Sequence, residues 1–262
     1  VRQSAYPREF TFDDYQAAAH ETSQLEGNEA RLRGRSIEEY LEGGFVEELW
    51  ETSIDDPYEG PPRDVPQYRR FWMMTLPVAT VREHIGTLQQ NVPRALVRHR
   101  KEFGDMSWYM AEHLGRLGLS FGAAVSSAVE KMGVGQVPAD APVAALDAHV
   151  AAYPDALRRE HPFVRKYGSV APGMPREFTC EYNSHLMMSG IARDYHDTAI
   201  SVRREGLAAE SLLLPVGQLA WAMTWVLQNR LAGAMAQELA VNLAKTRQRV
   251  LDNTVFGKGD DR

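Results

Sequence analysis

The stretch that decides the fold is PVGQLAWAMTWVLQNRLAGAMAQELAVNLAKTRQRVLDN, residues 215–253. Along it, apolar side chains return every three or four residues, the spacing that places them on one face of an α-helix. This apolar stripe consists of Leu219, Met223, Val226, Leu227, Leu231, Met235, Leu239, Leu243 and Val250. The spacing predicts a single, very long helix over residues 215–253.

The most apolar part of the chain, residues 207–227, overlaps the start of this helix. It contains Glu210, Pro215 and Gln218, and a charged or strongly polar group is costly inside a bilayer, so we interpret it as buried core. The first residues of the chain carry positive charge but no apolar segment of the kind that a secretion signal needs. We therefore expect a cytoplasmic protein that has no membrane partner.

The remainder of the sequence has the same helical pattern, with no convincing alternation of strand type and no internal repeat. Caps, prolines and apolar spacing predict helices that begin at residue 11 and that span 36–50, 77–102 with a kink or restart at Pro93, 107–117, 120–132, 142–152 and 181–205. The sequence therefore predicts an all-α bundle of about eight to ten helices. We expect a single all-α catalytic domain over residues 1–262, with flexible tails at 1–10 and 257–262.

Two long stretches that are rich in proline and glycine interrupt the helical pattern, at residues 55–66 and 161–180. Irregular segments of this length inside a compact domain are commonly functional or mobile. We expect both to be loops, and they are the candidate lids over a binding pocket.

Charge and cysteine content exclude several classes of protein. The 29 Lys and Arg residues against 35 Asp and Glu residues give a net charge of −6, without the basic excess of a nucleic-acid-binding domain. The single cysteine, Cys180, excludes a disulfide framework, a thiolate zinc cluster and covalent haem attachment through Cys-x-x-Cys-His. The motifs of dinucleotide binding, NTP hydrolysis, serine esterases and zinc peptidases are also missing. The eight histidines are left as the main candidates for chemistry.

His196 is the first candidate, and it lies within RDYHD, residues 193–197, in the middle of a predicted helix. The small side chains of Ala192 and Ala199 flank it on the same helical face, which leaves room for a flat ligand. A neutral imidazole can bind iron through one nitrogen while the other donates to a carboxylate or carbonyl. The alternative interpretation is a partly buried histidine with a structural role.

His84 is the second candidate, and it lies beside the apolar stripe of its predicted helix, where it could act as a general acid or base. The alternative is a surface histidine beside Arg82 and Glu83. His185 lies one i, i+4 step from Glu181, a pair that could bind non-haem iron or could simply be a pair on a helix surface.

The other charged candidates are weaker. Three arginines could each hold a substrate carboxylate or a haem propionate, with solvent exposure as the alternative: Arg82, Arg193 and Arg203. Two histidines are interpreted as solvated, and three more receive no role: His99 and His161, then His20, His113 and His149.

The arrangement resembles the histidine-ligated, haem-dependent aromatic oxygenase superfamily, of which tryptophan 2,3-dioxygenase is typical. Within it, the chain resembles the short bacterial branch of haem-dependent L-tyrosine hydroxylases. The resemblance covers residues 70–250, with one histidine in TLPVATVREHIGTLQQ (75–90) and a second in HLMMSGIARDYHDTAIS (185–201). The long C-terminal helix and the scarcity of cysteine complete it. The longer substrate-binding motifs of the dioxygenases have no recognisable copy, which puts the tryptophan-cleaving reaction in doubt.

The resemblance implies a b-type haem with His196 as the proximal iron ligand and His84 as the distal residue near the oxidant and the phenol. It implies hydroxylation of L-tyrosine to L-DOPA with hydrogen peroxide, for secondary-metabolite (antibiotic) biosynthesis. Arg193 and Arg203 are the candidate cofactor-binding arginines. A thiolate ligand from Cys180 is the weaker alternative to His196.

Two other functions compete with this one. The first is a non-haem di-iron oxidase built on Glu181, His185 and further carboxylates, which is weakened because the chain has no Glu-x-x-His pair. The second is a non-catalytic helical protein that oligomerises through its long C-terminal helix. An exposed face on that helix could also serve a homodimer of the enzyme.

Overall fold

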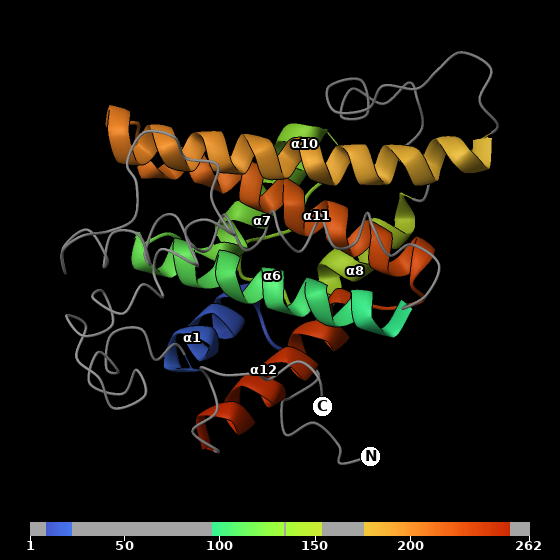
Figure 1. Ribbon diagram of the computed structural model, residues 1–262, viewed down its shortest axis with the longest axis horizontal. Helices are drawn as coiled ribbons and strands as arrows, with labels where there is room; N and C mark the ends of the chain where they lie inside the picture. The colour runs from blue at the N-terminus through green and yellow to red at the C-terminus, as the bar shows by residue number, and fades with distance from the viewer. Residues whose placement is uncertain (1–8, 23–95, 134, 154–175, 252–262) are drawn as a thin grey trace, which may run out of the picture.

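The structure is a computed structural model that describes residues 9–22, 96–133, 135–153 and 176–251. Within these ranges the chain forms seven α-helices, one short 3-10 helix and an isolated antiparallel bridge between Thr11 and Pro142 (Figure 1). The helices are α1 (Phe12–Thr22), α6 (Leu96–Arg116), α7 (Phe121–Met132), α8 (Val143–Ala152), α10 (Arg176–Glu205), the 3-10 helix η2 (Ala209–Leu212), α11 (Leu213–Arg230) and α12 (Met235–Leu251). The predicted all-α bundle is confirmed. None of the described helices is long and apolar enough to cross a membrane.

Several predicted elements lie outside the described residues, namely the helices at 36–50 and 77–92, the loop at 55–66 and most of both tails. The predicted start of α1 is confirmed by its cap. Asp14 N–H donates to Thr11 Oγ1 at 3.0 Å, and Thr11 N–H donates back to Asp14 Oδ2 at 2.8 Å. This backbone hydrogen bond and the Thr11 hydroxyl hold the pKa of Asp14 below its usual value. The helices predicted at 120–132 and 142–152 are also confirmed, each to within one residue.

Helix α6 corrects the prediction of a break between residues 102 and 107. It runs without interruption from Leu96 to Arg116, through Gly104. A Cβ at Gly104 would lie 2.9 Å from the Cβ of Asn242 in α12, so the glycine serves helix packing rather than helix termination. The predicted separate helix at 107–117 is the second half of α6.

Helix α10 corrects the prediction that residues 161–180 are wholly irregular. It begins at Arg176, directly after Pro175, and continues to Glu205. Cys180 therefore lies within the same helix as His196, not at a junction between loop and helix as predicted. Residues 161–175 lie outside the described residues.

The single long helix predicted at 215–253 is wrong, because the chain breaks after Arg230 and restarts at Met235. Ala232 adopts a left-handed backbone with φ of 48°, and the carbonyl of Leu227 accepts from the N–H groups of both Leu231 and Gly233. Asp147 of α8 then caps the new helix, accepting from Met235 N–H at 2.8 Å and Ala236 N–H at 3.0 Å. The apolar stripe continues across the break with a change of direction.

Helix α11 lies at the centre of the described bundle. Every residue from 215 to 227 is buried, which confirms the predicted core there, although Leu207 at the start of the apolar run is 44% exposed. Helices α6, α7, α8, α10 and α12 all contact α11. In Figure 1, α10 lies along one edge of the bundle, above α11, while α1 and α12 lie toward the opposite edge.

A glycine lets α7 approach α11 closely. A Cβ at Gly217 of α11 would overlap the backbone carbonyl of Ala124 and would lie 2.7 Å from the Cβ of Ala128, both in α7. Because the main obstacle is backbone, no side-chain rotation can relieve the overlap. Helices α7 and α11 can pack this closely only if residue 217 has no side chain.

We expect Gly217→Ala to lower the free energy of unfolding by about 1–3 kcal/mol, the usual cost of overpacking a core. Urea denaturation followed by circular dichroism measures the change. The matched control is Gly115→Ala in α6, where the added methyl group meets the Gln16 side chain, at 3.3 Å from Nε2, and no backbone. At that exposed helical site the loss of stability should be smaller than in Gly217→Ala, because a side chain rather than a backbone has to move. Equal effects in both variants would contradict the close approach.

Candidate functional site

His196 lies two-thirds of the way along α10 with only 13% of its side chain exposed. Ala192 and Ala199, one helical turn before and after it, are buried, so its neighbours along this face of α10 are small side chains. The ring Nδ1 lies 3.3 Å from Oδ1 of Asp197. A neutral imidazole that donates from Nδ1 carries its lone pair on Nε2, the nitrogen that is then able to ligate a metal.

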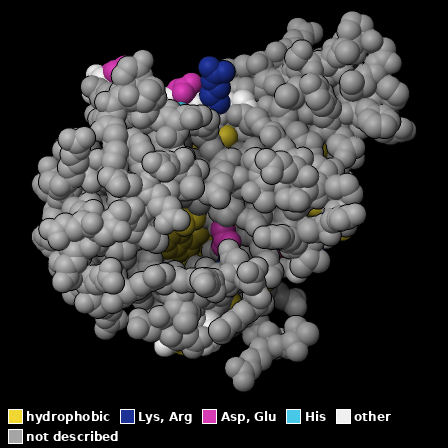
Figure 2. All heavy atoms as spheres, in the orientation of Figure 1, with side chains coloured by type: hydrophobic (Ala, Val, Ile, Leu, Met, Phe, Trp, Pro, Cys, Tyr) yellow, Lys and Arg dark blue, Asp and Glu magenta, His cyan; other side chains and the backbone are white. Residues whose placement is uncertain are grey.

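The charged neighbours of His196 lie on the outside of α10. Arg193 is 81% exposed, and its Nε lies 3.7 Å from Oδ2 of Asp197, so the carboxylate lies between the imidazole and the guanidinium. Figure 2 shows acidic and basic side chains standing out along the upper edge of the molecule, where Figure 1 places this part of α10. Arg193 can thus reach a negatively charged group only at the solvent side of the helix.

The remaining predicted site residues are not brought together by the described part of the chain. His84 and Arg82 lie outside the described residues. Arg203, His185 and Glu181 belong to α10, but their side chains are not described. Within the described ranges, no three histidine, cysteine, aspartate or glutamate side chains lie close enough together to hold a metal ion. A haem iron needs one axial protein ligand, so this finding does not bear on the haem prediction.

Sequence reasoning missed a buried pair behind His196. Tyr195, the residue before it, is fully buried, and its hydroxyl lies 2.6 Å from Nδ1 of His113 in α6. His113 is also fully buried, and its ring lies 5.6 Å from that of Tyr195, centroid to centroid. The sequence does indicate that His113 is buried, because it continues the three- and four-residue spacing of Phe103, Met106 and Met110. We call His113 and Tyr195 the buried pair.

The hydrogen-bond inventory indicates which atom of the buried pair donates. His113 Nε2 is buried and has no hydrogen-bond partner among the described residues. If Tyr195 donates to Nδ1, the pair leaves one unsatisfied group, the Nε2 hydrogen. If Nδ1 donates to Tyr195, both the hydroxyl hydrogen and the Nε2 lone pair are left over. Because unsatisfied buried polar groups are costly, we infer that Tyr195 donates and His113 accepts.

Burial sets the charge state of the pair. It lowers the pKa of His113 to about 4, with a smaller contribution from the positive charge of Arg116, so the imidazole is neutral at pH 7. Burial also raises the pKa of Tyr195 well above its usual value, so the phenol keeps its proton. The pair is therefore a neutral donor and a neutral acceptor inside the core.

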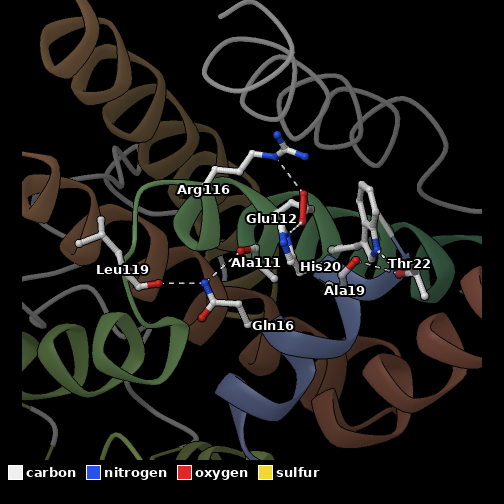
Figure 3. Close-up of polar contacts among 9 residues, drawn as sticks. Gln16, Ala19, His20, Thr22, Ala111, Glu112, Arg116 and Leu119 are labelled. Atoms are coloured by element: carbon white, nitrogen blue, oxygen red, sulfur yellow. Dashed lines mark hydrogen bonds and ion pairs between the residues drawn. The ribbon is translucent and has the colours of Figure 1, made fainter. Parts of the chain in front are cut away.

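Glu112, the residue before His113 in α6, contacts α1 through His20 (Figure 3). This buried carboxylate accepts from Arg116 Nε at 3.0 Å and lies 2.9 Å from Nδ1 of His20, whose side chain is 53% exposed. Gln16 of α1 donates to the carbonyls of Ala111 and Leu119 a short distance away. These contacts satisfy a buried charge and join two helices, so we assign them a structural role.

Comparison with known proteins adds no relative, since no protein-family model, curated protein or solved structure matches the chain. The family resemblance accordingly rests on the residues quoted from the sequence, and the reaction is a matter for proposal.

We expect the buried pair to make stability depend on pH. Between pH 6.5 and about 4, the unfolded chain takes up a proton at His113 that the folded chain refuses, so the free energy of unfolding falls as the pH falls. The full effect of this shift is roughly 3 kcal/mol. Urea denaturation at a series of pH values measures it.

The control is a pair of glutamine variants. His113→Gln should lose this dependence over the pH range 4 to 6.5, whatever its stability at neutral pH. His149→Gln removes a half-buried histidine of α8, whose pKa burial also lowers, and should keep the His113 contribution. An unchanged pH profile in His113→Gln would show that His113 titrates normally in the folded protein.

Proposed function

We propose that this chain is a histidine-ligated haem enzyme that hydroxylates the ring of an aromatic amino acid, L-tyrosine to L-DOPA with hydrogen peroxide. The observation that carries the proposal is His196, a mostly buried imidazole in the middle of a long helix, with alanines one turn away on each side. The residues quoted for the family resemblance support the same assignment. We place the reaction in secondary-metabolite biosynthesis, in the cytoplasm.

The donor chemistry around His196 fits a b-type haem. Nδ1 faces the Asp197 carboxylate, and a hydrogen bond there makes the imidazole a stronger donor to a metal at Nε2. The alanines one turn away on each side place no bulky side chain of α10 next to the imidazole that would hold the haem. When bound, a haem supplies the activation of peroxide that the protein side chains lack.

The other residues of the proposed site bind and move protons. His84 takes a proton from one peroxide oxygen and returns it to the other, the task of a general acid and base near neutral pH. Arg193, at the exposed side of α10, and Arg203, further along it, would hold the haem propionates or the substrate carboxylate.

We expect His196→Ala to abolish tight haem binding, because the imidazole that would hold the iron is removed. Equilibrium titration with haem, monitored by co-elution of haem and protein in gel filtration, measures the affinity. Circular dichroism establishes that the variant is folded. The matched control is His149→Ala in α8, which should bind haem like the unmodified chain. Normal haem binding by a folded His196→Ala variant would rule out this residue as the ligand.

We expect His84→Ala to retain haem and to lose turnover by about 10²–10⁴-fold, the usual contribution of a general acid or base. The assay follows L-DOPA formation from L-tyrosine and hydrogen peroxide. Activity within a few fold of the unmodified chain would remove His84 from the mechanism while leaving the haem assignment intact. L-tryptophan and tyrosine analogues, with peroxide or with oxygen and a reductant, define the substrate and the oxidant.

A further inference from the structure

We propose that Tyr195 is a redox-active tyrosine, which gives one electron to a peroxide-derived oxidant while its phenolic proton passes to Nδ1 of His113. The source of the oxidant rests on the proposed function, and the rest of the inference rests on the geometry of the buried pair. Such a site reduces an oxidant that has formed in the absence of substrate, before that oxidant damages the iron ligand.

The geometry of the buried pair suits coupled transfer of a proton and an electron. The 2.6 Å between Tyr195 Oη and His113 Nδ1 is short for a hydrogen bond, so the proton crosses with little movement of the heavier atoms. Both side chains are fully buried, which keeps solvent from competing for the proton. The imidazole is the only base in contact with the hydroxyl among the described residues.

The step balances within the pair. Tyr195 loses one electron to the oxidant, its O–H bond breaks, and a new N–H bond forms at His113 Nδ1. The products are a neutral phenoxyl radical, an imidazolium and an oxidant reduced by one electron. Although burial makes His113 a weak base, an oxidised phenol is so strong an acid that the transfer remains favourable. On re-reduction the proton returns to Tyr195.

The position of Tyr195 in the chain gives it access to the proposed reaction centre. Tyr195 and His196 are consecutive residues, so a single peptide unit joins the tyrosine to the proposed iron ligand. The tyrosine side chain lies in the core, while His196 is at the edge of the described bundle. An electron can thus pass from Tyr195 to His196 along a short covalent route, which moves the oxidation away from the ligand and into the interior.

Tyr15 provides a natural comparison. It is also fully buried, but among the described residues its hydroxyl is hydrogen-bonded only to amide oxygens, Oδ1 of Asn242 at 3.0 Å and the carbonyl of Gly104 at 3.3 Å. Burial raises the pKa of Tyr15, and the Asp105 carboxylate adds to this without a hydrogen bond to the hydroxyl. An amide oxygen is not a base that can keep the proton of an oxidised phenol. Tyr15→Phe is therefore the matched control for Tyr195→Phe, since each removes one buried hydroxyl.

The first experiment uses the haem-loaded full chain, mixed with hydrogen peroxide without substrate and frozen within the reaction time. We expect an electron paramagnetic resonance signal that ring-deuterated tyrosine narrows, as a tyrosyl radical requires. Tyr195→Phe should lose this signal and Tyr15→Phe should keep it. A signal unchanged in Tyr195→Phe, or one that responds to deuterated tryptophan instead, would overturn the proposal.

The second experiment uses the haem-free full chain, so that it does not depend on the proposed function. Azide radicals generated by pulse radiolysis oxidise tryptophan side chains, and transient absorption then follows transfer of the oxidation to tyrosine. We expect Tyr195→Phe to lose most of the phenoxyl absorption and Tyr15→Phe to lose little. Removal of the base in His113→Phe should slow phenoxyl formation by about 10²-fold, the smaller end of the effect of a positioned base.

The two experiments separate the two proposals. Phenoxyl formation at Tyr195 in the haem-free chain, together with no haem binding, would retain the redox tyrosine and reject the haem enzyme. Haem binding together with equal phenoxyl yields in Tyr195→Phe and the unmodified chain would retain the haem enzyme and reject the redox tyrosine. Circular dichroism of each variant establishes that the fold is intact.

Discussion

The described bundle depends on the burial of residues 215–227 of α11 on every side. A helix with no polar face cannot lie on a surface, so other helices must cover it all round, and α7, α8, α6, α10 and α12 do so. Gly217 sets how closely α7 can approach, because any side chain there meets backbone. The break at Ala232 turns the chain so that α12 returns toward α1 and α6 rather than continuing past the core.

Covering α11 also brings polar groups into the core, where each needs a partner. His113 and Tyr195 meet in this way, and so do the carboxylate of Glu112 and its two neighbours. Placing a tyrosine and a histidine in contact behind His196 gives α10 two chemical faces. One is a helix edge with a mostly buried imidazole beside small residues, and the other is a hydrogen-bonded pair in the interior.

Local sequence signals predicted the helical class, the Thr11 cap and the helices at 120–132 and 142–152, because caps and apolar spacing act within a few residues. These local signals failed where a residue distant in the sequence determines the local structure. The break in the last helix is stabilised by Asp147, almost ninety residues away, and Gly104 continues its helix because Asn242 packs against it. The hydrogen bond between His113 and Tyr195 joins α6 to α10. The apolar spacing within α6 indicated that His113 is buried, but it could not show which residue His113 contacts. The roles of His196, His84, Arg193 and Arg203 stay predictions.

The proposed chemistry requires that the imidazole of His196 ligates a haem. This ligation is tested by the optical spectrum of the chain with haem, recorded in the ferric state and as the reduced carbon monoxide adduct. We expect an intense Soret band whose carbon monoxide adduct has the position typical of histidine ligation. A strongly red-shifted adduct would indicate a thiolate, for which Cys180 is the only source, and a spectrum identical to that of free haem would contradict haem binding altogether.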